Sequence, residues 1–244
     1  MKIFYAFRSL FFYFFAAVTL CLGVPFVFLL AVFPFRYRFP IIAVWSRLMR
    51  HSLFWICGIR TNVHWPKGMS LKTLHGPYVI CSRHESALET LVFSGIFPMN
   101  CFVVKKTLLY IPVFGWAFRV SKHIPIDRTK AVRSMIEVIK IGRSRIKEGI
   151  SIAVFPEGTR MVPGVFRPFH KGAASIAKSM GVSVIPVSHN AGTCWRRNGF
   201  IKYPGTVTIE IGKPIPIKDL SVDQINEQVY DWMEKNYPKS TVME

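Results

Sequence analysis

The stretch Tyr78-Val79-Ile80-Cys81-Ser82-Arg83-His84-Glu85-Ser86-Ala87-Leu88-Glu89 joins a short apolar run to a helical pattern. The run Tyr78–Cys81 has the length and the residue types of a buried strand, and the helical pattern opens after Ser86. His84 and Glu89 therefore fall at a junction between a strand and a helix. Such junctions are the repeating unit of α/β folds.

The same alternation continues toward the C-terminus. Further apolar runs predict strands at Cys101–Val104, His123–Ile126, Ile150–Phe155, Val182–Val187 and Thr206–Ile211. Helical spacing of apolar residues predicts helices at Thr129–Lys147, Lys171–Met180 and Ser221–Asn236. Alternating strands and helices predict one α/β domain around a central sheet, which we place at residues 61–244.

The composition excludes two broad classes of protein. The chain has 244 residues, a formal net charge of +19 and a hydrophobic fraction of 51%. A disordered polycation would be poor in apolar residues, whereas aromatic residues alone make up 14% of this chain. A polytopic membrane protein needs several apolar spans of about 20 residues, and one stretch here qualifies.

That stretch is Ser9–Phe35, which carries no charged residue. It is too long for the apolar core of a signal peptide, so we expect it to be retained as a membrane anchor. Pro25 and Pro34 leave two forms open: a tilted span, or a helix that bends and returns. A buried core helix is the third, less favoured interpretation because the segment exceeds ordinary helix lengths.

A basic segment follows the apolar one and completes an N-terminal unit at residues 1–60. Arg36, Arg38, Arg47 and Arg50 alternate there with apolar and aromatic residues, a pattern typical of a helix that lies in the membrane interface. These arginines place the body of the protein on the cytoplasmic face, and we expect the inner membrane of a bacterium.

The excess of positive charge predicts a partner rich in phosphate. No acidic residue precedes Glu85. Because the basic residues are dispersed, with no run of five or six, we expect an anionic lipid membrane and no nucleic acid. The five cysteines form no C-x-x-C pair, which favours reduced, mostly buried thiols over disulfides or a metal site.

His84 and Glu89 are the first candidates for chemistry, as a general base and its orienting partner. Side chains five residues apart point in different directions on a regular helix, about 140° apart. The two can pair only if His84 precedes the helix and Glu89 lies in its first turns. The strand-to-helix junction supplies that arrangement.

A second candidate site is Phe155-Pro156-Glu157-Gly158-Thr159-Arg160, directly after a predicted strand. Binding loops of open α/β sheets lie at such strand ends. The Arg160 guanidinium can grip a phosphate with two hydrogen bonds, and Glu157 can accept hydrogen bonds from hydroxyls. Three other candidates receive structural interpretations: Ser86 as a helix cap, and His123 and His189 as framework residues.

Taken together, these residues resemble the lysophosphatidate acyltransferase (PlsC-like) family of glycerolipid acyltransferases. Four family blocks occur in order between about residues 78 and 190. They are His84 with Glu89, the segment from Lys105-Lys106-Thr107 to Ile126-Asp127-Arg128, the loop Phe155–Arg160, and Val184-Ile185-Pro186-Val187.

The resemblance implies a fold and an activity. The fold is a single glycerolipid-acyltransferase-like α/β domain whose central mixed sheet is flanked by helices. The activity is transfer of an acyl chain from acyl-CoA or acyl-carrier protein to the free hydroxyl of 1-acylglycerol 3-phosphate, giving phosphatidate. No metal and no cofactor are expected, because the thioester is already activated.

The resemblance also assigns roles to residues. His84 is the expected general base, and Glu89 stabilises the imidazolium. The expected substrate-binding residues are Glu157, Gly158, Thr159, Arg160, Arg128 and Lys105. Glu89 occupies a position that the family usually fills with Asp, which leaves open another lysolipid acceptor such as a lyso-ornithine lipid or lysophosphatidylglycerol. A membrane-surface protein that has lost catalysis is the alternative outside the enzymes.

Overall fold

The structure is a computed structural model, and it describes residues 1–127, 129 and 131–239. The strands are β1 Ile59–His64, β2 Val79–Ser82, β3 Asn100–Lys105, β4 Ile124–Ile126, β5 Ser151–Val154, β6 Val184–His189 and β7 Gly205–Ile211. The α-helices are α1 Lys2–Leu29, α2 Phe35–Cys57, α3 Leu88–Ile96, α4 Phe114–Val120, α5 Ala131–Lys147, α6 Gly172–Met180, α7 Ala191–Cys194 and α8 Val222–Lys235. The structure also has the 3-10 helices η1 Leu30–Val32 and η2 Lys106–Tyr110.

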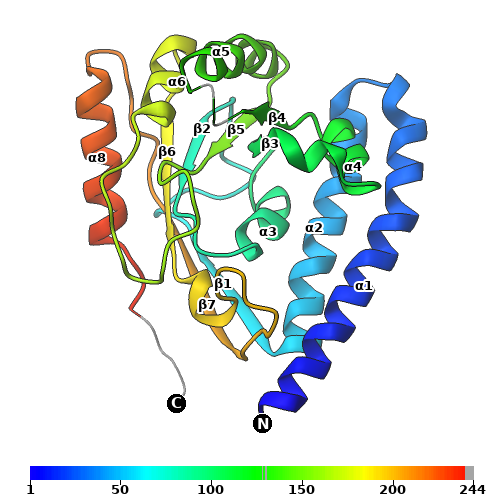
Figure 1. Ribbon diagram of the computed structural model, residues 1–244. Coiled ribbons are helices and arrows are strands. Elements are labelled where there is room, and N and C mark those ends of the chain that lie inside the picture. Colours follow the sequence, from blue (N-terminus) through cyan, green and yellow to red (C-terminus); the bar gives the residue numbers. More distant parts are fainter. Residues whose placement is uncertain (128, 130, 240–244) are drawn as a thin grey trace.

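The strands form one mixed sheet in the order β1-β7-β6-β2-β5-β3-β4 (Figure 1). Neighbouring strands run parallel except β6 and β7, which are antiparallel. The α/β class, the mixed sheet and the six predicted strands are confirmed, with shifts of one to two residues at most ends. The helices predicted at Thr129–Lys147, Lys171–Met180 and Ser221–Asn236 are confirmed as α5, α6 and α8.

Strand β1 was not predicted. Its burial alternates between inward and outward residues, with Arg60 and His64 turned outward, and its one neighbour in the sheet is β7. An edge strand with so many polar residues lacks the apolar run that marks the central strands. The boundary predicted between residues 60 and 61 falls inside this strand.

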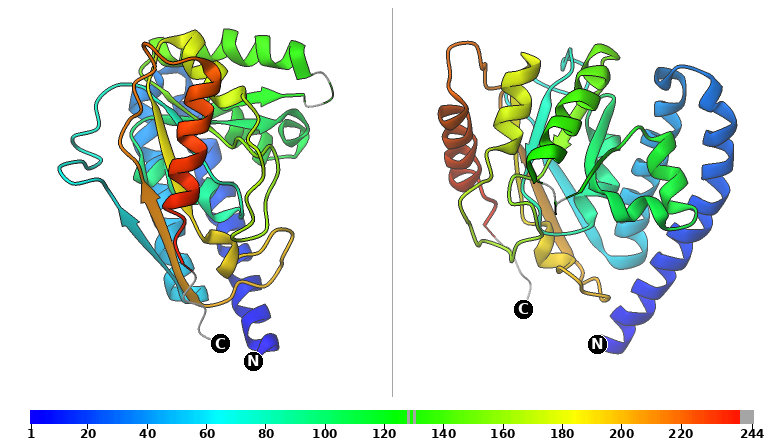
Figure 2. Two further views of the ribbon diagram at one scale, coloured as in Figure 1. Left: turned by 90° about the vertical axis from the view of Figure 1, so that its left-hand side faces the viewer. Right: turned by 45° about the horizontal axis from the view of Figure 1, so that its top comes forward.

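Helices lie on both faces of the sheet (Figures 1 and 2), and each face carries its own apolar core. Successive side chains of a strand point to opposite faces. Ile80 of β2 therefore joins a core with Met49 of α2 and Phe93 of α3. Its neighbour Val79 packs on the other face, in a core that also holds Ala177 of α6 and Val229 of α8.

The N-terminal segment forms a helical hairpin, in which α1 continues through Pro25 and the following basic segment, α2, makes the return. Helix α1 starts at Lys2, well before Ser9, and the chain turns through η1 and Pro34 into α2, which returns alongside α1 (Figure 1). Gly58 ends α2 in the left-handed conformation that favours glycine. Within the described residues, α1 with η1 is the element long and apolar enough to cross a membrane.

One side of α1 packs on the α/β domain. Phe12 is fully buried in the same core as the sheet. The backbone N–H of Lys202 donates to Ser9 Oγ over 2.8 Å, and the Lys202 ammonium lies 3.3 Å from the centre of the Tyr13 ring and 4.2 Å from that of Trp195. The hairpin is thus continuous with the body of the protein.

Candidate active site

The two candidate loops meet because their strands are neighbours. β2 and β5 are paired in parallel, with Cys81 opposite Val154. The chain leaves β2 into His84 and leaves β5 into the Phe155–Arg160 loop, so both loops emerge at the same edge of the sheet. The carboxyl-terminal edge of parallel strands is the usual place for a site in an open α/β sheet.

His84 and Glu89 form a close pair. His84 precedes α3, and Glu89 lies in the first turn of that helix, the arrangement that their spacing requires. His84 Nδ1 and Glu89 Oε1 are 2.7 Å apart. The same carboxylate oxygen accepts hydrogen bonds from the backbone N–H groups of Glu85 at 3.1 Å and Ser86 at 3.0 Å. One oxygen therefore fixes both the imidazole and the loop that carries it.

The environment keeps Glu89 ionised. Burial alone would raise the pKa of this carboxyl, but the hydrogen bond from His84, the nearby His189 and the Ser86 backbone bond lower it below its ordinary value. A carboxylate accepts hydrogen bonds and donates none, so Nδ1 of His84 carries the proton. The lone pair of the imidazole is therefore on Nε2, the position a general base uses.

The His84 ring is held in place from a second side. It stacks on Phe155 with ring centres 4.1 Å apart and an angle of 17° between the planes. The side chain keeps 14% of its surface exposed. Within the described residues Nε2 has no hydrogen-bond partner, which leaves it available to a substrate.

The Phe155–Arg160 loop turns through Gly158. The N–H of Gly158 donates to the Phe155 carbonyl over 3.1 Å, and φ at Gly158 is +67°, a conformation that side chains rarely adopt. A Cβ at this position would also lie 3.3 Å from the ring of His170. The backbone conformation favours glycine here, and a Cβ would in addition have to displace the His170 ring slightly.

Glu157 points into the protein. Its side chain is 1% exposed, its Oε2 accepts a hydrogen bond from the His84 N–H at 2.9 Å, and its Oε1 lies 3.2 Å from Arg83 Nε. Glu157 is among the residues expected to bind the glycerol phosphate. Both of its carboxylate oxygens have neighbours inside the protein.

The other expected binding residues lie at the same edge of the sheet. Lys105 ends β3 and is exposed, and Thr159 and Arg160 are partly exposed. Across the described residues, neither the Lys105 ammonium nor the Arg160 guanidinium forms an ion pair with a carboxylate. Arg128 lies outside the described residues. Two cations without carboxylate partners suit an anionic ligand.

The structural interpretations of the remaining candidates fit their contacts. Ser86 Oγ accepts a hydrogen bond from the Leu88 N–H at the start of α3. His123 is partly buried, the loss of solvent around its ring lowers its pKa to about 3, and its Nδ1 accepts a hydrogen bond from the Phe102 N–H. His189 bridges the backbone of the Arg83 and Ala191 segments.

Sequence reasoning gave no role to Arg83 and Glu85, which are fully buried beside His84. Charged residues next to a catalytic candidate usually lie in solvent, so the sequence carries no signal for their burial. Four of the five cysteines are buried, as expected. The described residues contain no group of three or more His, Cys, Asp or Glu side chains arranged to hold a metal ion.

Known proteins of one enzyme family are similar to this chain. The Acyltransferase family profile matches residues 61–190. The chain is 34% identical over 211 residues to a 1-acyl-sn-glycerol-3-phosphate acyltransferase of Pseudomonas aeruginosa, covering 84% of this chain and 80% of the relative. It is 30% identical over 187 residues to the enzyme of that name from Saccharomyces cerevisiae, covering 75% of this chain and 60% of the relative.

A solved structure shares the fold. The crystal structure of the 1-acyl-sn-glycerophosphate acyltransferase PlsC from Thermotoga maritima superposes with a TM-score of 0.80. The match covers 96% of this chain and 95% of that chain, at 24% sequence identity. The N-terminal hairpin and the α/β domain therefore both lie within the shared fold.

Proposed function

The chain belongs to the acyltransferase family, with 1-acyl-sn-glycerol-3-phosphate acyltransferases among its relatives, and on that premise we propose that it acylates lysophosphatidate to phosphatidate. The acyl donor in this proposal is acyl-CoA or acyl-carrier protein. The observation that carries the proposal is the 2.7 Å His84–Glu89 pair, which leaves Nε2 of the imidazole open at the sheet edge.

The proposed reaction needs one base and no acyl-enzyme. Nε2 of His84 takes the proton from the free hydroxyl of the lysolipid while the hydroxyl oxygen attacks the thioester carbonyl. The tetrahedral intermediate then collapses, the C–S bond breaks, and the imidazolium returns the proton to the departing thiolate. Glu89 stabilises the imidazolium between these steps. General-base help of this kind is worth about 10²–10⁴-fold in rate.

The phosphate of the acceptor binds beside the base in this proposal. Arg160 and Lys105 supply positive charge from the ends of two neighbouring strands, and Gly158 and Thr159 form the turn that carries Arg160. Arg128 belongs to the proposed set by its position after β4. Exposed cations without carboxylate partners favour a ligand that carries phosphate.

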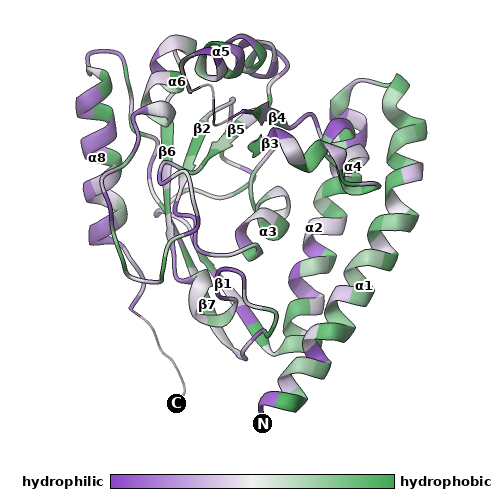
Figure 3. Ribbon diagram, in the orientation of Figure 1, coloured by the Kyte–Doolittle hydropathy of each residue, from purple (hydrophilic) through white to green (hydrophobic). Residues whose placement is uncertain are grey.

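The protein associates with membranes through its N-terminal hairpin. Hydrophobic residues cover most of α1 (Figure 3), and the side turned from the body exposes Phe4, Phe7, Phe11, Phe14 and Leu22. An apolar face of this length is suited to contact with the acyl chains of a lipid bilayer. Membrane association also places the enzyme where its lipid substrate is found.

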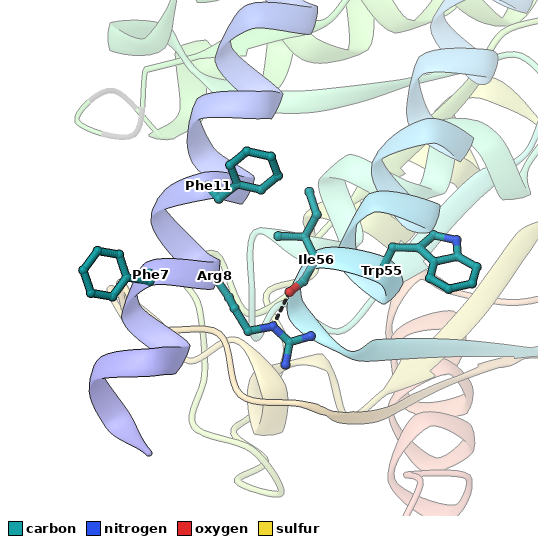
Figure 4. Close-up of a pocket in the computed structure, with 5 residues that line it drawn as sticks. All are labelled: Phe7, Arg8, Phe11, Trp55 and Ile56. Carbon is teal, nitrogen blue, oxygen red and sulfur yellow. Dashed lines mark hydrogen bonds between the residues drawn. The ribbon is translucent and has the colours of Figure 1, made fainter.

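We further propose that the membrane is anionic. A pocket of about 470 Å³ between α1 and α2 is lined by Phe7, Arg8, Phe11, Trp55 and Ile56 (Figure 4). Arg8 Nε donates a hydrogen bond to the Ile56 carbonyl, and no described carboxylate forms an ion pair with its guanidinium. A fixed cation on an apolar face suits the head group of an anionic lipid at the cytoplasmic face of a bacterial inner membrane.

An acceptor panel tests the proposed function. The purified protein is incubated in vesicles with a labelled acyl thioester and, in separate reactions, lysophosphatidate, lysophosphatidylglycerol or a lyso-ornithine lipid. We expect diacyl product chiefly from lysophosphatidate, identified by mass. Product from another acceptor alone would move the assignment to that lysolipid, and no product from any acceptor would favour the membrane-surface protein without catalysis.

A further inference from the structure

Arg83 lies at the centre of a buried cluster directly beneath the proposed base. Its side chain is fully buried, as is that of Glu85, and Arg83 Nη2 donates to Glu85 Oε1 over 3.0 Å. The same nitrogen donates to the Val165 carbonyl over 3.0 Å. Arg83 also packs on the Phe166 ring, with the guanidinium carbon 3.9 Å from the ring centre. One side chain thereby joins the β2 loop to the segment that follows the Phe155–Arg160 loop.

The cluster reaches the base through the backbone. Glu157, whose Oε1 lies 3.2 Å from Arg83 Nε, accepts the His84 N–H on its other oxygen. The His84 carbonyl accepts a hydrogen bond from the Met161 N–H at 2.7 Å. His189 Nε2 donates to the Arg83 carbonyl at 2.9 Å. Both peptide groups that flank His84 are therefore held by residues of other strand ends.

Burial affects the protonation of Glu157 within this cluster. Burial raises the pKa of Glu157 to about 8, although the nearby Arg83 and the His84 N–H lower it. Glu85 shares the Arg83 guanidinium and also accepts the Gly192 N–H at 3.1 Å. Removing a carboxylate partner would leave the buried Arg83 guanidinium uncompensated, which costs free energy. The arrangement that keeps these partners in place is therefore favoured.

We propose that Arg83 and Glu157 are positioning residues that fix the backbone of His84, and that Glu157 contacts no substrate. The inference rests on the proposed function, because it assigns these residues to the acyl transfer that His84 performs. Both residues act on catalysis by holding the His84 imidazole in position. A shift of about 1 Å in a reacting group can cost about 10²-fold in rate.

Steady-state kinetics separates positioning from substrate contact. The Arg83→Lys variant keeps the charge but cannot reach Glu85, Glu157 and the Val165 carbonyl at once, so we expect kcat to fall by about 10²-fold with KM for lysophosphatidate within twofold. The pH–rate profile should also move, with its rising limb at lower pH, because a displaced His84 loses its bond to Glu89. Partial unfolding alone would lower the rate without moving the profile.

Glu157 offers a conservative rescue. Glu157→Gln retains an oxygen that accepts the His84 N–H, so we expect it to keep at least tenfold more kcat than Glu157→Ala. A residue that binds the acceptor would instead raise KM in both variants, as we expect for Arg160→Gln. Arg133→Lys, on the exposed surface of α5, is the matched control for the arginine change.

Hydrogen exchange tests the inference without any substrate. In Arg83→Lys and Glu157→Ala, exchange in a peptide spanning residues 83–86 should become at least tenfold faster than in the wild type, while Arg133→Lys leaves it unchanged. Unchanged exchange, unchanged kcat in an active enzyme, or a rise in KM for the Glu157 variants would overturn the inference. A wild type without activity on lysophosphatidate would overturn the proposed function and leave the exchange result to decide the positioning role.

Discussion

Replacing Glu89 by glutamine removes the charge behind His84 and keeps an oxygen in almost the same place. The amide oxygen can occupy the position of Oε1 and accept the bonds from the imidazole and from the Glu85 and Ser86 N–H groups. The amide nitrogen then takes the position of Oε2, which is buried and has no partner. An unpaired buried group costs about 1–3 kcal/mol, so we expect the fold to survive.

Catalysis should suffer much more than stability. The variant leaves the imidazolium without its carboxylate at the moment when the base carries the proton. The expected loss is that of general-base help, about 10²–10⁴-fold in kcat. That range corresponds to about 3–5 kcal/mol of activation free energy.

The assay is the initial rate of phosphatidate formation, with the thermal midpoint measured on the same samples. Glu137→Gln, which removes an exposed carboxylate of α5, is the control and should keep the wild-type rate. Glu89→Asp should give an intermediate rate, because the shorter side chain retains the charge but not the reach to all three donors. A Glu89→Gln variant that turns over within threefold of the wild type would remove Glu89 from the mechanism.

Three further changes test other parts of the structure. The pKa of Glu157 is raised from 4.5 to about 8, so the stability given by its neutral form is fully present below about pH 4.5 and is lost as the pH rises toward 8. In urea unfolding, the free energy of unfolding should fall by about 1.4 kcal/mol per pH unit across that window. Glu157→Gln should flatten this slope, and Glu137→Gln should leave it intact. Lys202→Ala removes a fully buried side chain enclosed by Tyr13 and Trp195, and it should lower the free energy of unfolding by about 2 kcal/mol or more in the same assay; no loss would refute the contribution of this contact. Arg8→Gln should weaken binding to anionic vesicles by about fivefold in a flotation assay, with neutral vesicles and Arg133→Gln unaffected, and an equal loss on both kinds of vesicle would contradict the lipid site.

Local sequence patterns were sufficient to predict the central sheet and the contact between His84 and Glu89. Apolar runs predicted every strand that is buried on both faces, because burial of both faces makes nearly every residue of such a strand apolar. The spacing of His84 and Glu89 fixed where the helix must begin, and α3 begins between them.

The missing parts depend on contacts between distant segments. Strand β1 is defined by its pairing with β7, whose partner residues lie 146 positions later in the chain (Ile59 opposite Gly205). The burial of Arg83 depends on Glu157 and Val165, and that of Lys202 depends on the aromatic residues of α1. A charged residue is expected at the surface unless its partners are known. The buried cluster of Arg83, Glu85 and Glu157 beside His84 was therefore not predicted.

The inward direction of the Glu157 side chain also depends on contacts between segments that are distant in the sequence. The sequence indicates a turn at Gly158 but not which side chain of the turn faces the sheet. The register of β2 and β5, with Cys81 opposite Val154, places His84 and Glu157 side by side. That register is a property of the assembled sheet.

The most direct test of the account compares wild type and His84→Ala for phosphatidate formation from lysophosphatidate and a labelled acyl thioester in anionic vesicles. The account predicts robust product from the wild type and a rate at least 10²-fold lower from the variant, with the thermal midpoint little changed. Equal rates from the two proteins would contradict it.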